Sequence, residues 1–221
     1  MRLTPHLKQI TYGGNDGIVT TFAIVAGFAG AGADGAAGIG ALAVLVFGLA
    51  NLFADGVSMG LGEFLSTRSA RALYRTERAQ VLAGADAAAL ERMLQARGLT
   101  EETAAQAAAH LKESPSLVAD LLAGAGVAMP DMRGARPALD GLVTFLAFIA
   151  FGFVPLLPFL LAGPEAGSLG ASVAASLAAL IALGALRARA TGEALWLALA
   201  EVLGVGCLCG LVAFAVGALV G

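Results

Sequence analysis

The stretch Ala54-Asp55-Gly56-Val57-Ser58-Met59-Gly60-Leu61-Gly62-Glu63 places two carboxylates and one thioether inside a long apolar run. A carboxylate in hydrocarbon is energetically costly, so an acid at membrane depth is by default a functional residue. Asp55, Met59 and Glu63 recur at every fourth position, which aligns them along one face of a helix. Oxygen ligands select hard divalent cations, and one sulfur shifts the preference toward a transition metal such as Fe²⁺. The stretch therefore predicts a membrane helix that forms part of a metal path.

The composition of the whole chain agrees with a membrane protein. Hydrophobic residues make up 58% of the chain and charged residues 13%, with a mean hydropathy of +0.84. These values lie far from those of an average soluble domain. The 30 glycines fit helices that pack closely through small residues in lipid. Cys207 and Cys209 lie in an apolar run and point in different directions on a helix, so they predict packing rather than a disulfide or zinc site.

Five apolar runs are long enough to cross a hydrocarbon core of about 30 Å. We place them near 14–33, 38–65, 138–161, 168–186 and 194–220. The polar stretch between the second and third runs is rich in helix-forming residues and predicts an inserted helical domain. The expected fold is an all-α membrane protein with five transmembrane helices and a cytoplasmic helical insertion between the second and third spans. Its expected parts are an amphipathic N-terminal helix with spans one and two (1–66), the insertion (67–136) and spans three to five (137–221).

The distribution of basic residues predicts the orientation of these spans. All 13 lysines and arginines lie before the first span, within the insertion, or between the fourth and fifth spans. Five spans place all of these segments on one side, which the positive-inside rule identifies as the cytoplasm. The N-terminus is then cytoplasmic and the C-terminus extracytoplasmic. The high alanine, glycine and arginine content suggests a GC-rich bacterial genome, and hence a bacterial inner membrane.

Several polar residues outside the opening stretch have two interpretations each. Glu201 lies within the fifth span and either relays protons or binds a neighbouring helix near the headgroups. His6 and His110 are expected to be surface residues rather than ligands. The insertion carries glutamates that would gather a divalent metal if its helices packed suitably, although solvated helix faces are the favoured interpretation; they are Glu77, Glu91, Glu101, Glu102 and Glu113.

Two motifs together carry a resemblance to a known family. They are Gly14-Asn15-Asp16-Gly17-Ile18-Val19-Thr20-Thr21-Phe22-Ala23 and the opening stretch followed by Phe64-Leu65-Ser66. Both resemble the vacuolar iron transporter family, whose members have five spans. The resemblance covers nearly the whole chain, because the number of spans, their orientation and the position of the insertion also match.

The resemblance implies a metal path with named residues. It implies a homodimer in which the first two spans of both subunits carry Fe²⁺, and often Mn²⁺, out of the cytosol in exchange for protons. Asp16 and Met59 match metal ligands of the family. Asn51 occupies the position where plant members tend to have a glutamate, and an amide cannot carry a proton. We therefore expect Asp55 to supply part of the missing charge, with Glu63 nearer the cytoplasmic end.

The insertion departs further from the family pattern. Glu77 and Glu91 match two of the acids that form the cytoplasmic metal site of the family. Gln80 and Ala88 fall where other acids are expected, and the region of the third helix has only apolar residues, Leu121, Leu122 and Ala123. We expect a cytoplasmic metal site that is weakened or lost.

Two classes of function remain after this comparison. The first is proton-coupled export of Fe²⁺ or Mn²⁺, with the bilayer, protons and a second copy of the chain as partners. The alternative is a non-transporting membrane metal sensor or scaffold that retains the fold. The sequence shows no phosphate-binding loop, no nucleophile with its base and no dinucleotide-binding motif. We therefore expect no enzyme activity, no cofactor beyond the transported ion, and no nucleic-acid partner.

Overall fold

The structure, a computed structural model, describes residues 6–32, 39–84, 87–115, 117–118, 120–121, 132, 134–162 and 169–221. Over these residues the regular structure is entirely helical, which confirms the predicted all-α class. The chain divides into two compact units, one made of Met1–Phe64 with Pro137–Gly221 and the other of Leu65–Arg136.

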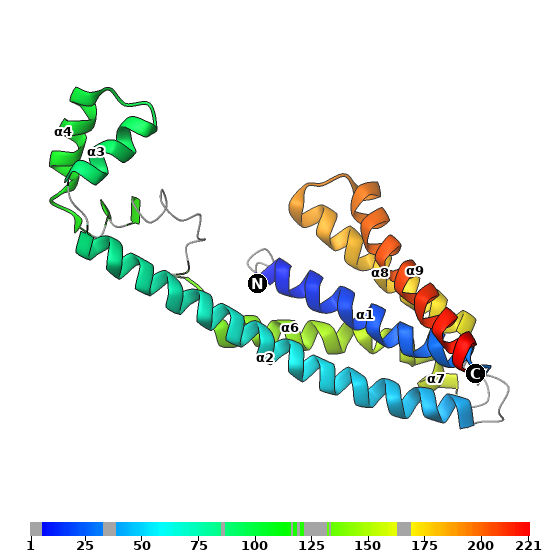
Figure 1. Cartoon of the computed structure of the whole chain (residues 1–221). Helices are drawn as coiled ribbons and strands as arrows, with labels where there is room; N and C mark the ends of the chain where they lie inside the picture. The colour runs from blue at the N-terminus through cyan, green and yellow to red at the C-terminus, as the bar shows by residue number, and fades with distance from the viewer. Residues whose placement is uncertain are drawn as a thin grey trace. The chain divides into compact units, whose positions relative to one another are not determined.

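The first unit is built around its N-terminal helix. Its helices are α1 (Leu7–Gly30), the first part of α2 (Ile39–Gly84), α6 (Pro137–Gly152), the short 3-10 helix η3 (Val154–Leu156), α7 (Leu157–Ala162), α8 (Leu169–Thr191) and α9 (Leu195–Val220). Helix α1 packs against α6, α8 and α9, and Figure 1 shows it in the middle of this group. The polar residues of the first motif are therefore carried on the central helix of the unit.

Helix α1 runs without interruption from Leu7 to Gly30. Of the predicted amphipathic helix, the described residues from Leu7 to Thr11 form the first turns of α1. Gly13 and Gly14 do not break the helix, because each lies in a tight contact with a neighbouring helix. A Cβ atom at Gly13 would lie 2.6 Å from the carbonyl oxygen of Thr144 on α6.

Small residues allow the helices of this unit to approach one another closely. A Cβ atom at Gly17 would overlap the carbonyl oxygen of Phe148 on α6. On the other side of α1, a Cβ atom at Gly30 would overlap the carbonyl oxygen of Phe214 on α9. Such backbone-to-backbone approach through glycine is typical of helices that associate in lipid.

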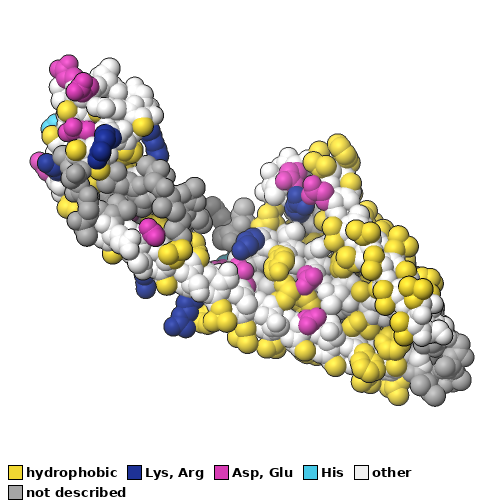
Figure 2. Space-filling view, in the orientation of Figure 1, with side chains coloured by type: hydrophobic (Ala, Val, Ile, Leu, Met, Phe, Trp, Pro, Cys, Tyr) yellow, Lys and Arg dark blue, Asp and Glu magenta, His cyan; other side chains and the backbone are white. Residues whose placement is uncertain are grey.

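The interior and the surface of the first unit are both apolar. Two buried clusters fill the interior: one contains Ile18, Leu180, Leu183 and Val202, and the other contains Val25, Leu52, Phe148, Leu156 and Phe159. The outer side of α9 exposes a series of large hydrophobic residues, Leu208, Leu211, Val212, Phe214, Val216 and Leu219. Figure 2 shows hydrophobic side chains covering much of the visible surface of α8 and α9. An apolar surface around an apolar interior is what a bilayer requires of a protein.

Four of the described helical segments are long and apolar enough to cross a membrane: Gly40–Gln80, Pro137–Leu161, Leu169–Thr191 and Leu195–Val220. The chain is therefore a multi-pass membrane protein. The first predicted span corresponds to α1, which is not among the four because Asn15 and Asp16 lower its hydropathy. The segment Pro137–Leu161 changes helix type at η3, where Ser172 Oγ donates a hydrogen bond of 2.8 Å to the carbonyl oxygen of Pro155.

The second unit contains the remainder of α2, together with α3 (Ala87–Ala96) and α4 (Glu101–Leu111). Its small core is formed by Leu90, Ala108 and Val118. The side chain of Thr100 caps α4 by accepting a hydrogen bond from the backbone nitrogen of Thr103. Of the apolar residues predicted to replace the third-helix metal ligands, Leu122 and Ala123 lie outside the described residues.

Candidate functional site

The candidate site residues of the first unit are carried by α1 and α2, which run in opposite directions (Figure 1). On α1, Gln9, Asp16 and Thr20 share one face, since they are spaced by seven and then four residues. On α2, the corresponding residues follow one another at intervals of four: Asn51, Asp55, Met59 and Glu63. The acids of these two faces lie at two positions along the helices, which we call the first level (Glu63) and the second level (Asp16 and Asp55).

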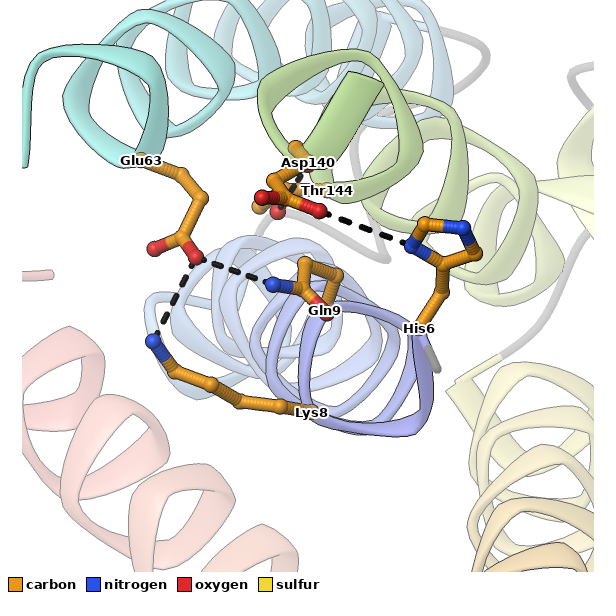
Figure 3. A network of polar contacts seen from close by, with 6 residues as sticks. All are labelled: His6, Lys8, Gln9, Glu63, Asp140 and Thr144. Carbon is orange, nitrogen blue, oxygen red and sulfur yellow. Dashed lines mark hydrogen bonds and ion pairs between the residues drawn. The ribbon is translucent and has the colours of Figure 1, made fainter. Parts of the chain in front are cut away.

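The first level is centred on Glu63, which lies beside the start of α1. Its Oε1 atom accepts hydrogen bonds from Lys8 Nζ at 3.3 Å and from Gln9 Nε2 at 3.1 Å. The Glu63 side chain is only 9% exposed, whereas that of Lys8 is 75% exposed. Figure 3 shows both α1 side chains converging on this carboxylate. The acid is thus held at the rim of the unit by one charged and one neutral donor.

The second level is formed by two aspartates, one from each helix. Asp16 and Asp55 are close enough for their charges to interact. Thr20 Oγ1 donates to Asp16 Oδ1 at 3.5 Å, and Asn51 Nδ2 donates to Asp55 Oδ2 at 2.9 Å. Within the described part of the chain, neither aspartate forms an ion pair with a lysine or arginine. Two carboxylates without a basic partner, one on each helix, are groups that a divalent cation would neutralise.

Met59 lies between these two levels, one helical turn from Asp55 and one from Glu63. Its side chain is half-buried and packs against the cluster that contains Leu52 and Phe148. The thioether is therefore both a candidate soft ligand and part of the hydrophobic packing of α2. Methionine suits both roles, because its side chain is flexible and polarisable.

Beyond the aspartates, the far end of the two helices opens into an apolar groove. Asn51 lines this groove, which has a volume of about 650 Å³ and is bounded by α1, α2 and α9. The other residues along its wall include Ala23, Gly27, Phe47 and Gly217. Asn51 is the only polar side chain among the described residues that line this groove.

The structure does not gather all predicted ligands into one cluster. Among the residues it describes, no group of three or more histidines, cysteines, aspartates or glutamates could hold a metal ion. In the first unit the acids are divided between the two levels. In the second unit, Glu77 on α2 and Glu91 on α3 are half-buried and do not belong to such a group. A complete coordination shell would need further ligands from the backbone, from water or from a second copy of the chain.

Some residues near the site were missed or misjudged from sequence. Gln9 and Thr20 share the helical face of Asp16, a periodicity that would have revealed them. His6, predicted to be a surface residue, is only 16% exposed, and its Nδ1 atom lies 3.5 Å from Asp140 Oδ1 (Figure 3). This pairing joins α6 to the start of α1, and no sequence pattern indicated it.

The structure supports the interpretation in which Glu201 binds a neighbouring helix. Arg187 donates to its Oε2 atom from the neighbouring helix α8 at 2.7 Å. The same guanidinium lies 3.1 Å from Glu193 in the connection between α8 and α9. Glu201 thus helps to join α8 and α9.

Comparison with known proteins agrees with these features. Vacuolar iron transporter 2 of Oryza sativa subsp. japonica is 27% identical over 214 residues, which cover 94% of this chain and 85% of that protein. Vacuolar iron transporter 1 of Arabidopsis thaliana is 28% identical over 195 residues, covering 85% of this chain and 75% of its own. The vacuolar iron transporter of Toxoplasma gondii is 42% identical over 73 residues, covering 33% and 22%. The model of the VIT family matches residues 7–218. The chain therefore belongs to the VIT family.

Proposed function

We propose that this protein exports Fe²⁺, and also Mn²⁺, from the cytosol in exchange for protons. The observation that carries the proposal is the pair of aspartates, Asp16 on α1 and Asp55 on α2, neither of which has a basic partner among the described residues. A protein that only needed these helices as a scaffold would have no reason to keep two acids there. The relatives named as vacuolar iron transporters support the choice of metal.

The proposed topology has five spans with a cytoplasmic N-terminus. Helix α1 has 24 residues, a length of about 36 Å, which is enough to cross a hydrocarbon core. Adding α1 to the four apolar segments gives an odd number of spans, with the Leu65–Arg136 unit in the cytoplasm and the C-terminus outside. The proposed location is the inner membrane of a bacterium.

The proposed route follows the levels between α1 and α2. An ion first meets the Glu63 carboxylate, then the Met59 thioether, and then the two aspartates. From there it passes Asn51 and leaves through the apolar groove. Hard oxygen ligands at both levels, with one sulfur between them, suit Fe²⁺ and Mn²⁺ better than Ca²⁺ or Mg²⁺.

Proton exchange follows from the chemistry of carboxylate ligands. A carboxylate must be deprotonated to bind a metal, so metal binding releases any proton that the group carries. Asp16 and Asp55 are the acids of the second level, and Asn51 cannot exchange a proton. We therefore assign the coupling to the two aspartates and expect protons to return as the metal leaves.

A homodimer is the proposed working form. Small residues recur at every fourth position on α2, and all four are exposed: Ala50, Ala54, Ser58 and Gly62. A Cβ atom at Gly62 would meet nothing within 4 Å. Such a stripe permits close approach of a second helix in lipid. It lies next to the face that carries Asp55 and Met59, so a second copy would bring further ligands to the incomplete site.

The proposal can be tested with purified protein in proteoliposomes. Anaerobic Fe²⁺ uptake should fall by at least about tenfold in Asp16→Asn and in Met59→Ala, because each removes a path ligand. Glu201→Gln is the matched control, since it neutralises an acid that belongs to neither α1 nor α2 and is paired with Arg187 on α8. Unchanged flux in both path variants would remove Asp16 and Met59 from the route. Metal binding without flux in the wild type would favour the sensor or scaffold.

A further inference from the structure

The side chain of Lys8 places a positive charge at the entrance of the proposed route, beside Glu63. Its ammonium lies 3.3 Å from Glu63 Oε1, and it is the only basic residue of α1. Glu63 is largely buried, so without a cation its charge would be poorly compensated. The exposed Lys8 chain therefore neutralises an acid that the proposed function assigns to the arriving metal.

The geometry leaves room for exchange between the two cations. Both described contacts of Glu63, from Lys8 and from Gln9, are made to the same oxygen, Oε1. Within the described residues, the other oxygen has no hydrogen-bond partner and remains open to a second ligand. The lysine chain is flexible and three-quarters exposed, so releasing its ammonium into water requires no change in the helices.

We propose that Lys8 is a built-in competitor that an incoming divalent cation must displace from Glu63. This inference rests on the proposed function and deepens it, because it identifies a residue that sets selectivity at the entrance. A monovalent cation gains no charge advantage over the ammonium that it would replace. A divalent cation does, since its attraction to the same carboxylate is twice as large at equal distance. The ammonium of Lys8 raises the apparent Kd of every cation at Glu63 by the same factor, so the weakly attracted Na⁺ and K⁺ are kept out at concentrations at which the more strongly attracted Fe²⁺ or Mn²⁺ still binds.

The competing interpretation is that the Lys8–Glu63 pair merely ties α1 to α2. A purely structural ion pair and a cation that competes for Glu63 predict opposite changes in metal affinity when Lys8 is removed. Removal of a tie would loosen the site and weaken metal binding. Removal of a competitor would tighten binding, and only while the Glu63 carboxylate is present.

The test is a titration of full-length protein in detergent with Mn²⁺, following free Mn²⁺ by electron paramagnetic resonance. Lys8→Gln should lower the Mn²⁺ Kd by about two- to fivefold, the range expected for an exposed ion pair. Lys8→Arg should leave the Kd near the wild-type value. Lys112→Gln, which removes the only other lysine of the chain, is the matched control and should have no effect. In a Glu63→Gln background, Lys8→Gln should also have no effect.

A second titration measures how strongly Na⁺ competes with Mn²⁺. Added Na⁺, at constant ionic strength maintained with a large organic cation, should weaken Mn²⁺ binding more in Lys8→Gln than in the wild type. The proposal is overturned if Lys8→Gln leaves the Kd unchanged or raises it. It is also overturned if the tightening persists in Glu63→Gln, or if neither wild type nor Lys8→Gln binds Mn²⁺. Because binding is measured without transport, normal binding behaviour with no flux would refute the proposed function and leave the role of Lys8 standing.

Discussion

The contact of Gly17 with α6 allows the loss of stability in Gly17→Ala to be calculated. A Cβ atom at this position would overlap the carbonyl oxygen of Phe148 and lie 3.1 Å from the backbone nitrogen of Gly152. Both are backbone atoms of α6, so neither can rotate away as a side chain would. The substitution Gly17→Ala must therefore push α1 and α6 apart.

Two opposing effects decide the change in stability. Alanine is favoured over glycine within a helix by about 1 kcal/mol. Forcing an extra carbon into a close-packed contact typically costs about 1–3 kcal/mol, and a rigid backbone contact belongs in the upper part of that range. We expect Gly17→Ala to lower the free energy of unfolding by about 1–2 kcal/mol in total. Because Asp16 is the preceding residue, its carboxylate should also move relative to Asp55, and Fe²⁺ flux should fall about tenfold or more.

The assay is thermal unfolding of the detergent-purified protein, paired with flux in proteoliposomes. Gly204→Ala on α9 is the matched control, since a Cβ atom there would meet nothing within 4 Å. It should keep or slightly raise the melting temperature, because only the helix preference of alanine acts at that site. If Gly17→Ala melts at the same temperature as Gly204→Ala and transports normally, the close approach of α1 and α6 does not position the site.

Three further variants address coupling, assembly and the α8–α9 connection. Asp55→Asn should weaken the dependence of flux on an imposed pH gradient more than Glu63→Gln does, and equal effects would move the coupling site away from the aspartates. Gly62→Leu should block close approach of a second α2 helix and yield monomers by light scattering in detergent, whereas an intact dimer would exclude the small-residue stripe as the interface. Arg187→Gln should lower the free energy of unfolding by about 1 kcal/mol or less, because its partners are exposed. That loss should shrink at high salt, and a salt-independent loss would point to packing of the arginine stem.

The helical class and most of the apolar segments were predictable because they depend on local composition. Long runs of Leu, Val, Ala and Phe specify membrane helices whatever their neighbours are. The spacing of Asp55, Met59 and Glu63 at every fourth position likewise placed both acids on one face of α2. Helix α1 was harder, because the two polar residues that give it a functional face also reduce its hydropathy.

The contacts between helices were not predictable from one sequence. Pairing of Glu63 with Lys8 and Gln9 depends on the register of α1 against α2, which no local pattern specifies. The same holds for the His6–Asp140 contact, since Asp140 lies on α6, far along the chain. Met59 shows a further difficulty, because one side chain both packs against the core and lies between two candidate metal-binding levels.

Proton coupling through the two aspartates makes metal movement respond to a pH gradient. The most direct test is Fe²⁺ flux in proteoliposomes under pH gradients of equal size and opposite sign, with the membrane potential clamped. Metal–proton exchange should give faster movement toward the extracytoplasmic side when that side is acidic and slower movement when the gradient is reversed. It also predicts that Asp16→Asn abolishes this difference. Equal wild-type flux under both gradients would contradict the exchange mechanism and make the protein a facilitated pathway for the metal.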